Sequence, residues 1–320
     1  MKPAGNAIRS PAGVAVSGLA TKPRLLEFCY EAASQPDLSN DDMKQPRVSP
    51  ILAGVILALA LMPAAAQPRR IVSINACTDQ LLFKLAPERI AALSTYAADP
   101  TLSIYAEEVR ASRAPLIRGN VEEVLKRKPD LVLAGGWTRR ATRDRLKQEG
   151  VRVEEFAAPN TVEEVLASIR RMAGLLGEEA RGEEMLRGID DAVSRAADAS
   201  GRGLSALQFK RRGFTSGEGT LLGDIFRKLG LRNAAAPLGV RTVGRAPLET
   251  VLKTRADLLI LLEADGDTPD QGTALLHHPA LLAAYPPERR LVLASRLTVC
   301  GGPATPVALD RLGEALRRVP

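Results

Sequence analysis

Short apolar runs alternate with amphipathic segments along residues 70–156 and again along residues 204–318. Runs such as RIVSI (70–74) and LSALQF (204–209) are typical of buried strands, and apolar residues recur at helical spacing between such runs. This alternation predicts an α/β fold with parallel, doubly wound sheets. Residues from Thr161 to about 200 show helical periodicity alone. They predict one helix that begins at a capping box of Thr161 and Glu164, and a second at about 179–198.

One helix–strand unit occurs twice in the chain. It reads RGNVEEVLKRKPDLVLA from Arg118 and RAPLETVLKTRADLLIL from Arg245. The copies match at Glu122 and Glu249, Lys126 and Lys253, and Asp130 and Asp257. Repeats this far apart predict two similar α/β lobes. The helix at about 179–198 would span roughly 30 Å, so we expect a rigid connection between the lobes and a cleft in which a small ligand binds.

The N-terminal region predicts export. Residues 1–42 show no sustained periodicity and read as an upstream extension, which translation from Met43 would omit. Residues 43–66 combine a basic start, an apolar run of about 12 residues and a small-residue cleavage site near Ala66, as in a signal peptide. The alternative is a cytoplasmic tail with a signal anchor, although a membrane span needs roughly 20 apolar residues. The predicted domains are an N-terminal lobe (67–176), a linker helix (177–200) and a C-terminal lobe (201–320).

Composition and charge exclude several kinds of function. The net charge is +7, but the arginines lie beside glutamates along predicted helices, so we expect solvated faces and no nucleic-acid partner. The only histidines, His277 and His278, are adjacent and cannot form a facing pair of metal ligands, so we predict no metal site. Two cysteines of the exported part, Cys77 and Cys300, lie in predicted loops of different lobes. They form either a bridge that restrains the lobes or two small thiols.

At this point residues 69–318 resemble a known family. The strand RIVSI, the KPDLV unit, the helical connection and FTSGEGTLLGDIF followed by LGLRNAA occur in the order found in periplasmic substrate-binding proteins of ABC importers for ferric siderophores, haem and cobalamin. The resemblance implies a monomeric, non-catalytic receptor without a cofactor, which carries a metal chelate in the periplasm to a permease dimer in the inner membrane. It also implies that Glu122 and Glu249 dock on arginine pockets of the permease, although the helix macrodipole alone favours glutamate there.

Loops at the carboxyl ends of the strands line the cleft of such a fold. They nominate as ligand-binding residues Asn75, Cys77, Tyr96, Trp137, Arg139, Lys210, Arg211, Arg212, Phe214, Arg241 and Arg296. The single tryptophan, Trp137, can stack on a flat ligand, and the arginines suit carboxylates or the charged oxygens of a chelate. Two cleft aromatics of the cobalamin receptors are replaced by Leu116 and Val243, which argues against cobalamin. We predict that Thr78 or Asp79 caps the helix after Cys77.

Two other functions remain open on the residues alone. One is an exported enzyme that uses Asp79, Asp99 or Cys77 in the cleft. The other is a signalling or chaperone-like relative that keeps the two lobes but binds no ligand. A catalyst would need carboxylates that face each other within reach of a substrate, and a ligand-free relative would have no saturable small ligand.

Overall fold

The computed structural model describes residues 67–199, 203–263 and 270–319. They belong to one compact unit, Pro63–Pro320. The predicted extension (1–42) and signal peptide (43–66) lie outside the described residues. Within the described ranges, no helix combines the length and apolar content that a membrane crossing requires.

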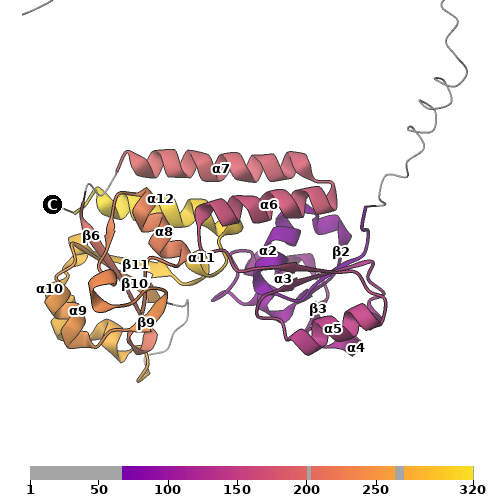
Figure 1. Ribbon diagram of the computed structural model, residues 1–320, viewed down its shortest axis with the longest axis horizontal. Helices are drawn as coiled ribbons and strands as arrows, with labels where there is room; N and C mark the ends of the chain where they lie inside the picture. The colour runs from indigo at the N-terminus through magenta and orange to yellow at the C-terminus, as the bar shows by residue number, and fades with distance from the viewer. Residues whose placement is uncertain (1–66, 200–202, 264–269, 320) are drawn as a thin grey trace, which may run out of the picture. The chain divides into compact units, whose positions relative to one another are not determined.

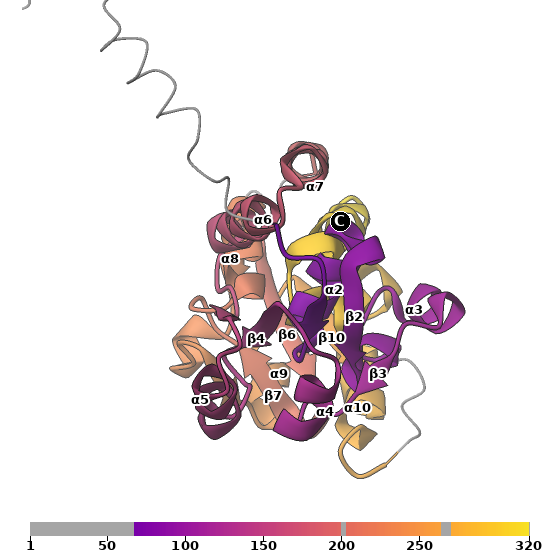
Figure 2. The ribbon, with the colours of Figure 1, turned by 90° about the vertical axis from the view of Figure 1, so that its right-hand side faces the viewer.

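The first lobe is built on a five-stranded parallel sheet with the order β3-β2-β1-β4-β5. Its strands are β1 (Ile71–Ser73), β2 (Ile90–Ser94), β3 (Leu116–Ile117), β4 (Leu131–Gly135) and β5 (Val153–Phe156). Helices cover both faces (Figure 2): α2 (Ala76–Leu85) and α3 (Ala106–Ser112) pack on one, and α4 (Val121–Lys126) and α5 (Arg140–Gln148) on the other. The strand order reverses between β1 and β4, and a doubly wound sheet opens a crevice at such a point.

The second lobe carries a six-stranded sheet with the order β11-β10-β6-β7-β9, in which β8 also pairs with β6. Its strands are β6 (Ser205–Lys210), β7 (Phe214–Ser216), β8 (Arg232–Asn233), β9 (Val243–Arg245), β10 (Leu258–Glu263) and β11 (Arg290–Ala294). The helices of this lobe are α8 (Leu221–Lys228), α9 (Leu248–Thr254), α10 (Pro279–Ala284) and α11 (Arg296–Val299). The fold class, two doubly wound α/β lobes joined by a long helix, is confirmed.

One part of the second sheet differs from the predicted parallel arrangement. β7 runs antiparallel to both β6 and β9, so this sheet is mixed. The chain reverses in a 3-10 turn, Arg211–Gly213, in which Arg212 and Gly213 adopt positive φ angles of 59° and 72°. A strand of three residues has no readable period, so β7 cannot be recognised from the sequence pattern alone.

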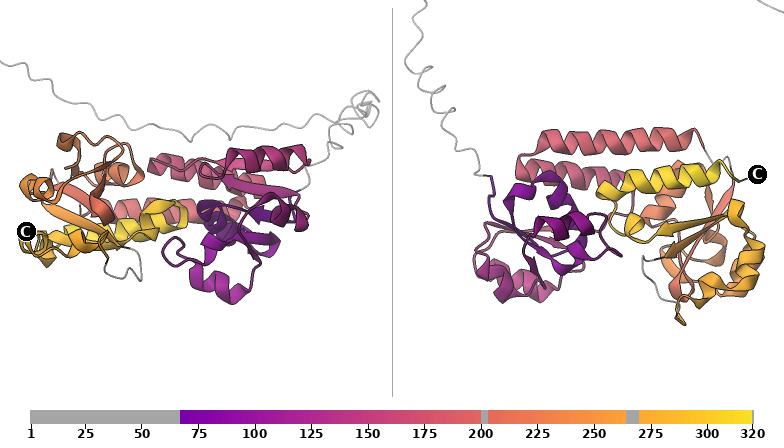
Figure 3. Two further views of the ribbon diagram at one scale, coloured as in Figure 1. Left: turned by 90° about the horizontal axis from the view of Figure 1, so that it is seen from below. Right: turned by 180° about the vertical axis from the view of Figure 1, so that it is seen from behind.

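Two long helices connect the lobes. α6 (Val162–Leu176) leads into α7 (Glu179–Ala197), and α12 (Thr305–Leu316) packs along α7 (Figures 1 and 3). α7 buries one stripe at helical spacing, which includes Met185, Ile189 and Ala192. A Cβ on Gly182 would lie 2.5 Å from the Cβ of Ala173, so the glycine permits the close approach of α6 and α7. One apolar cluster therefore runs from the first sheet through these helices to the second.

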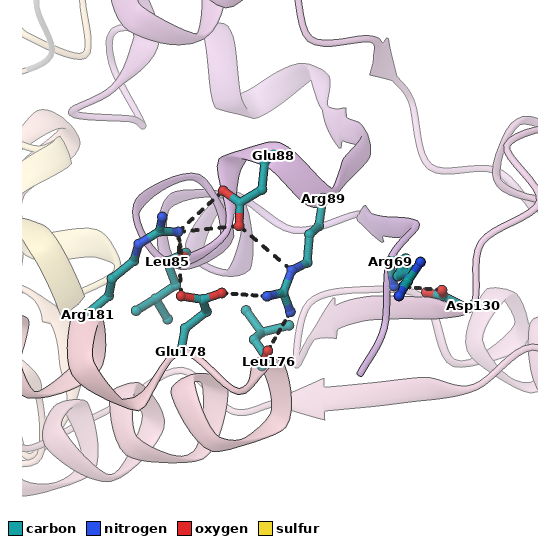
Figure 4. Close-up of polar contacts among 8 residues, drawn as sticks. All are labelled: Arg69, Leu85, Glu88, Arg89, Asp130, Leu176, Glu178 and Arg181. Atoms are coloured by element: carbon teal, nitrogen blue, oxygen red, sulfur yellow. Dashed lines mark hydrogen bonds and ion pairs between the residues drawn. The ribbon is translucent and has the colours of Figure 1, made fainter. Parts of the chain in front are cut away.

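Arginines fix both ends of α7. At its start, Arg181 Nη1 donates to a main-chain carbonyl at the end of α2 at 2.5 Å, and Arg89 Nη2 donates to Glu178 Oε1 at 2.5 Å (Figure 4). Near its end, Arg195 makes a bidentate pair with Asp310 of α12 at 3.1 and 3.0 Å. The Arg89–Glu178 pair is mostly buried, so solvent weakens it less than a surface pair. α7 is thus anchored to the first lobe and to the C-terminal helix.

The repeated aspartates have the same structural role in both lobes. Asp130 accepts from the main-chain N–H groups of Arg69 and Arg70 at 2.7 and 3.1 Å, beside the start of β1 (Figure 4). Asp257 accepts from the N–H and the hydroxyl of Ser205 at 2.7 and 2.8 Å, at the start of β6. Each aspartate ties its copy of the repeat to the central strand of its lobe, so folding accounts for this part of the repeat.

Candidate functional site

The point where the first sheet reverses its strand order forms a crevice between the lobes. It is lined by residues that follow β1, including Asn75 and Cys77, by Trp137 after β4, by Phe156 at the end of β5, and by residues 300–303 of the second lobe. Its cavity volume of about 30 Å³ leaves room for about two water molecules. The chelate expected from the sequence is far larger and would have to contact exposed side chains around the crevice.

Asn75 lines this crevice and is the N-cap residue of α2. Its Oδ1 accepts from the N–H groups of Cys77 and Thr78 at 3.0 and 3.4 Å. The prediction that Thr78 or Asp79 caps this helix is therefore wrong. A Cβ on Gly135 would lie 2.3 Å from Asn75, so the glycine at the end of β4 lets the two loops meet. The amide of Asn75 is engaged in folding, and its contribution to binding stays a prediction.

A disulfide joins Cys77 and Cys300 across the crevice. Cys77 lies in the first turn of α2, not in the predicted loop, and Cys300 ends α11. Residues 223 positions apart in the chain are thus linked beside the candidate site. Arg296, at the start of α11, also reaches the first lobe, because its Nη1 donates to the carbonyl of Pro100 at 3.2 Å.

Two predicted aromatic residues are exposed on the first lobe. The side chain of Trp137 is 86% exposed, and that of Tyr96, which follows β2, is 53% exposed. Large aromatic side chains usually bury most of their surface, so this exposure leaves two ring faces available to a ligand. Leu116 and Val243, which the resemblance matches to aromatic positions of cobalamin receptors, are also exposed at 40% and 56%.

The predicted basic residues of the second lobe fall into two groups. The Lys210 ammonium lies 6.0 Å from the ring centroid of Phe214, and the Arg245 guanidinium lies 4.7 Å from the same centroid. Arg211 instead pairs with Asp270 and holds the pKa of that carboxyl at about 2. Phe214 with its two cations is a candidate platform, in which Arg245, from the strand-end loop that also contains Arg241, lies opposite Phe214 in the β7–β9 pair.

The remaining predicted residues do not line the crevice. Arg139 is the exposed N-cap residue of α5, and Arg212 and Arg241 are also exposed. The N–H of Arg212 donates to the carbonyl of Gly272 at 2.7 Å, and the carbonyl of Arg241 accepts from Gly219 at 2.8 Å. The side chains of these three arginines have no hydrogen-bond or ion-pair partner in the described part of the chain.

The side chains nominated for catalysis are each occupied elsewhere. Cys77 is in a disulfide and has no thiolate to offer. Asp99 Oδ1 accepts from the N–H and hydroxyl of Thr101 at 2.8 and 2.7 Å, as in a turn. Asp79 is only 1% exposed and hydrogen bonds to the N–H and hydroxyl of Ser94. Among the described residues that line the crevice, there are no facing carboxylates of the kind that the enzymatic hypothesis requires.

Burial of Asp79 predicts an unusual dependence of stability on pH. Loss of solvation raises the pKa of this carboxyl from 3.8 to about 7, although hydrogen bonds from Ser73 and Ser94 oppose the shift. As pH rises from about 4, the unfolded chain ionises first, so this group destabilises the fold progressively until about pH 7.

We expect Asp79→Asn to remove this pH dependence. Relative to the variant, the wild-type protein should lose roughly 3 kcal/mol of unfolding free energy between pH 5 and pH 8. Urea unfolding of both proteins across this range measures the difference. Asp191→Asn, which removes an exposed carboxylate from α7, controls for the change in net charge. Parallel profiles for wild type and Asp79→Asn would contradict the assignment.

Comparisons with known proteins relate this geometry to a family. The periplasmic binding protein family matches residues 71–290. A cobalamin-binding protein of Halobacterium salinarum is 25% identical over 218 residues, which are 67% of this chain and 59% of that protein. This chain thus spans only 59% of the length of the curated relative.

Solved structures share the fold at lower identity. The periplasmic heme-binding protein RhuT from Roseiflexus sp. RS-1 has 22% identity and a TM-score of 0.62, and the match covers 78% of this chain and 99% of that one. An ABC-type Fe³⁺-hydroxamate transport system structure from Saccharomonospora viridis has 22% identity and a TM-score of 0.60, with 78% and 93% covered. The fold, the crevice and a family match over most of the sequence agree: this chain belongs to the periplasmic binding protein family.

Proposed function

We propose that this protein is the solute-binding component of an ABC importer, which captures a metal chelate between its lobes and delivers it to a membrane permease. The family suggests a location outside the cytoplasm. The observation that carries the proposal is Trp137, 86% exposed where the first sheet reverses its strand order. A doubly wound sheet places its ligands at this point.

The exposed aromatic and basic side chains of the two lobes favour a flat ligand with negative charge. Tyr96 adds a second exposed ring on the same lobe, and Lys210 and Arg245 flank the ring of Phe214 on the other. Aromatic faces stack on planar conjugated systems, and guanidinium groups bind carboxylates or chelate oxygens. A haem-like macrocycle with carboxylates or a ferric siderophore with aromatic or anionic groups fits this combination. Cobalamin fits less well, because Leu116 and Val243 replace ring faces.

Metal would enter inside such a chelator. Among the residues that the structure describes, no group of three or more His, Cys, Asp or Glu side chains could hold a metal ion. A receptor for bare zinc or manganese needs several such ligands converging on one point.

We infer that Glu122 and Glu249 dock the receptor on the permease. Both lie in the first turn of a repeat helix, α4 and α9, and both are exposed. In Figure 1 these helices lie on the side away from α7. A capping role does not explain Glu122, because the neighbouring Glu123 is the glutamate that accepts a main-chain N–H before α4, from Arg118 at 2.7 Å. Neither Glu122 nor Glu249 has a side-chain partner among the described residues.

For the chain outside the site we propose the organisation predicted above. The signal peptide (43–66) is removed near Ala66 to release a periplasmic monomer with an N-terminal lobe (67–176), a linker helix (177–200) and a C-terminal lobe (201–320). N-terminal sequencing of the exported protein tests the cleavage site.

A titration of residues 67–320 with haemin, ferric siderophores and cobalamin tests the proposed ligand class. Trp137 is the only tryptophan, so its emission reports directly on the site. We expect saturable quenching by one class of chelate, after correction for absorbed light with free tryptophan amide. Binding to the Trp137 variants is followed by the absorbance of the ligand. The affinity of Trp137→Ala should be lower than that of wild type by about tenfold or more, whereas that of Trp137→Phe, which keeps a stacking ring, should remain within a few-fold of wild type. A folded protein that responds to none of these compounds would support the ligand-free relative.

A further inference from the structure

The repeat places basic residues at equivalent positions in the two lobes. Besides the glutamates and aspartates, Lys126 matches Lys253, and Lys128 matches Arg255. All four of these side chains, here called the outer cations, are exposed. None of them has an ion-pair partner among the residues that the structure describes. Each lobe therefore presents an exposed glutamate and two unpaired cations on one short helix and the residues after it.

Topology places the outer cations at the end of the helix far from the cleft. α4 leads into β4 and α9 leads into β10, and the carboxyl ends of these strands lie at the cleft, next to Trp137 and Lys210 respectively. A helix that precedes a parallel strand runs back along the sheet from that edge. The glutamate in the first turn is thus near the cleft, and the outer cations, at the last turn and beyond, are near the outer edge of each lobe.

Local folding does not account for all four cations. Lys126 and Lys253 lie in the last helical turn, where the macrodipole favours positive charge. Lys128 and Arg255, however, adopt positive φ angles of 49° and 48° just after their helices. Glycine is the least strained residue in this conformation. Both lobes nevertheless carry a long cationic side chain at this equivalent position, and no ion pair among the described residues accounts for it.

We propose that the outer cations bind anionic phospholipid headgroups of the membrane around the permease. This inference rests on the proposed docking through Glu122 and Glu249, which turns the helices α4 and α9 toward the membrane and leaves their outer ends at the periphery of the contact. Headgroup phosphates are complementary to exposed, flexible cations. Each basic residue near an anionic surface strengthens binding by about fivefold. Such binding is weak and screened by salt, which suits a receptor that must dissociate after delivery.

Vesicle co-sedimentation of residues 67–320, which contain the whole described core, tests the inference without any permease. The wild-type protein should bind vesicles that contain phosphatidylglycerol, bind pure phosphatidylcholine much less, and dissociate in 0.5 M salt. The variant K126Q/K128Q/K253Q/R255Q should bind the anionic vesicles at least a hundredfold more weakly. Glutamine keeps the backbone cost of the two positive φ positions unchanged.

A matched variant controls for total charge. R170Q/R187Q/R311Q/R318Q neutralises four exposed arginines in or just after α6, α7 and α12, on the other side of the fold, and should bind like wild type.

Equal binding by the two quadruple variants, or no binding of wild type to anionic vesicles, would overturn the inference. A further assay uses phosphatidylcholine vesicles that contain the permease. If K126Q/K128Q/K253Q/R255Q lost binding only in that assay, the inference would also be overturned, because the partner of the outer cations would then be acidic protein. Quenching of Trp137 by the chelate should be unchanged in both variants, so a failed ligand assignment is distinguishable from a failed membrane contact.

Discussion

Uptake is expected to fall to background when Glu122 and Glu249 are both replaced by lysine. Each substitution would place a cation against an arginine pocket of the permease, and apposed like charges cost several kcal/mol at an interface. A loss at both lobes should lower transport by at least a hundredfold. Ligand affinity should remain within twofold of wild type, since both side chains are exposed and neither lines the crevice. Uptake of labelled chelate by cells, together with the Trp137 titration, measures the two quantities separately.

Single variants and a charge control sharpen this result. Glu122→Lys or Glu249→Lys alone should leave partial uptake, because one lobe still docks correctly. Glu183→Lys with Glu184→Lys makes the same change in net charge on exposed positions of α7 and should transport normally. Normal uptake by the Glu122→Lys/Glu249→Lys protein would remove the docking assignment, and weakened ligand binding would point instead to a role in folding or in the site.

The repeat made most of the architecture predictable from the sequence. A helix and an apolar strand that occur twice, separated by two helical segments, require two α/β units with a connection between them. The predicted helix at about 179–198 is observed as Glu179–Ala197, because Met185, Ile189 and Ala192 keep a helical period throughout. Asp130 and Asp257 also match in structure, since each binds the start of its central strand. Local periodicity and repeated residues are properties that one sequence displays directly.

The candidate site was less predictable, because its geometry comes from contacts between distant residues. The pairing of Phe214 with Arg245 depends on a chain reversal at Arg212 and Gly213 that has no periodic signal. The N-cap role of Asn75 was missed because Thr78 and Asp79 are equally good capping residue types. Strand-end loops could be nominated from topology, but whether Arg139 or Trp137 reaches the crevice depends on packing.

Removal of the Cys77–Cys300 disulfide is expected to cause the largest loss of stability. The bridge links residues 223 positions apart, so the unfolded chain loses much conformational freedom when it is present. Without the bridge, the lobes are still tied by Asp224, which accepts from the N–H of Val162 at 2.8 Å, and by the helices. The cost should be about 2–5 kcal/mol, a large part of the 5–15 kcal/mol typical of a domain.

Urea unfolding of C77A/C300A against the oxidised wild-type protein measures this loss. Alanine is chosen over serine because position 300 is only 6% exposed, and serine would bury a hydroxyl group there. Wild-type protein reduced with dithiothreitol should unfold at nearly the same urea concentration as the variant, because both lack the same constraint. The single variants should match the double variant under reducing conditions, which separates the bridge from the packing of each sulfur. Equal stability of oxidised and reduced wild type would mean that the helices alone hold the lobes, and that the bridge restrains the crevice without stabilising the fold.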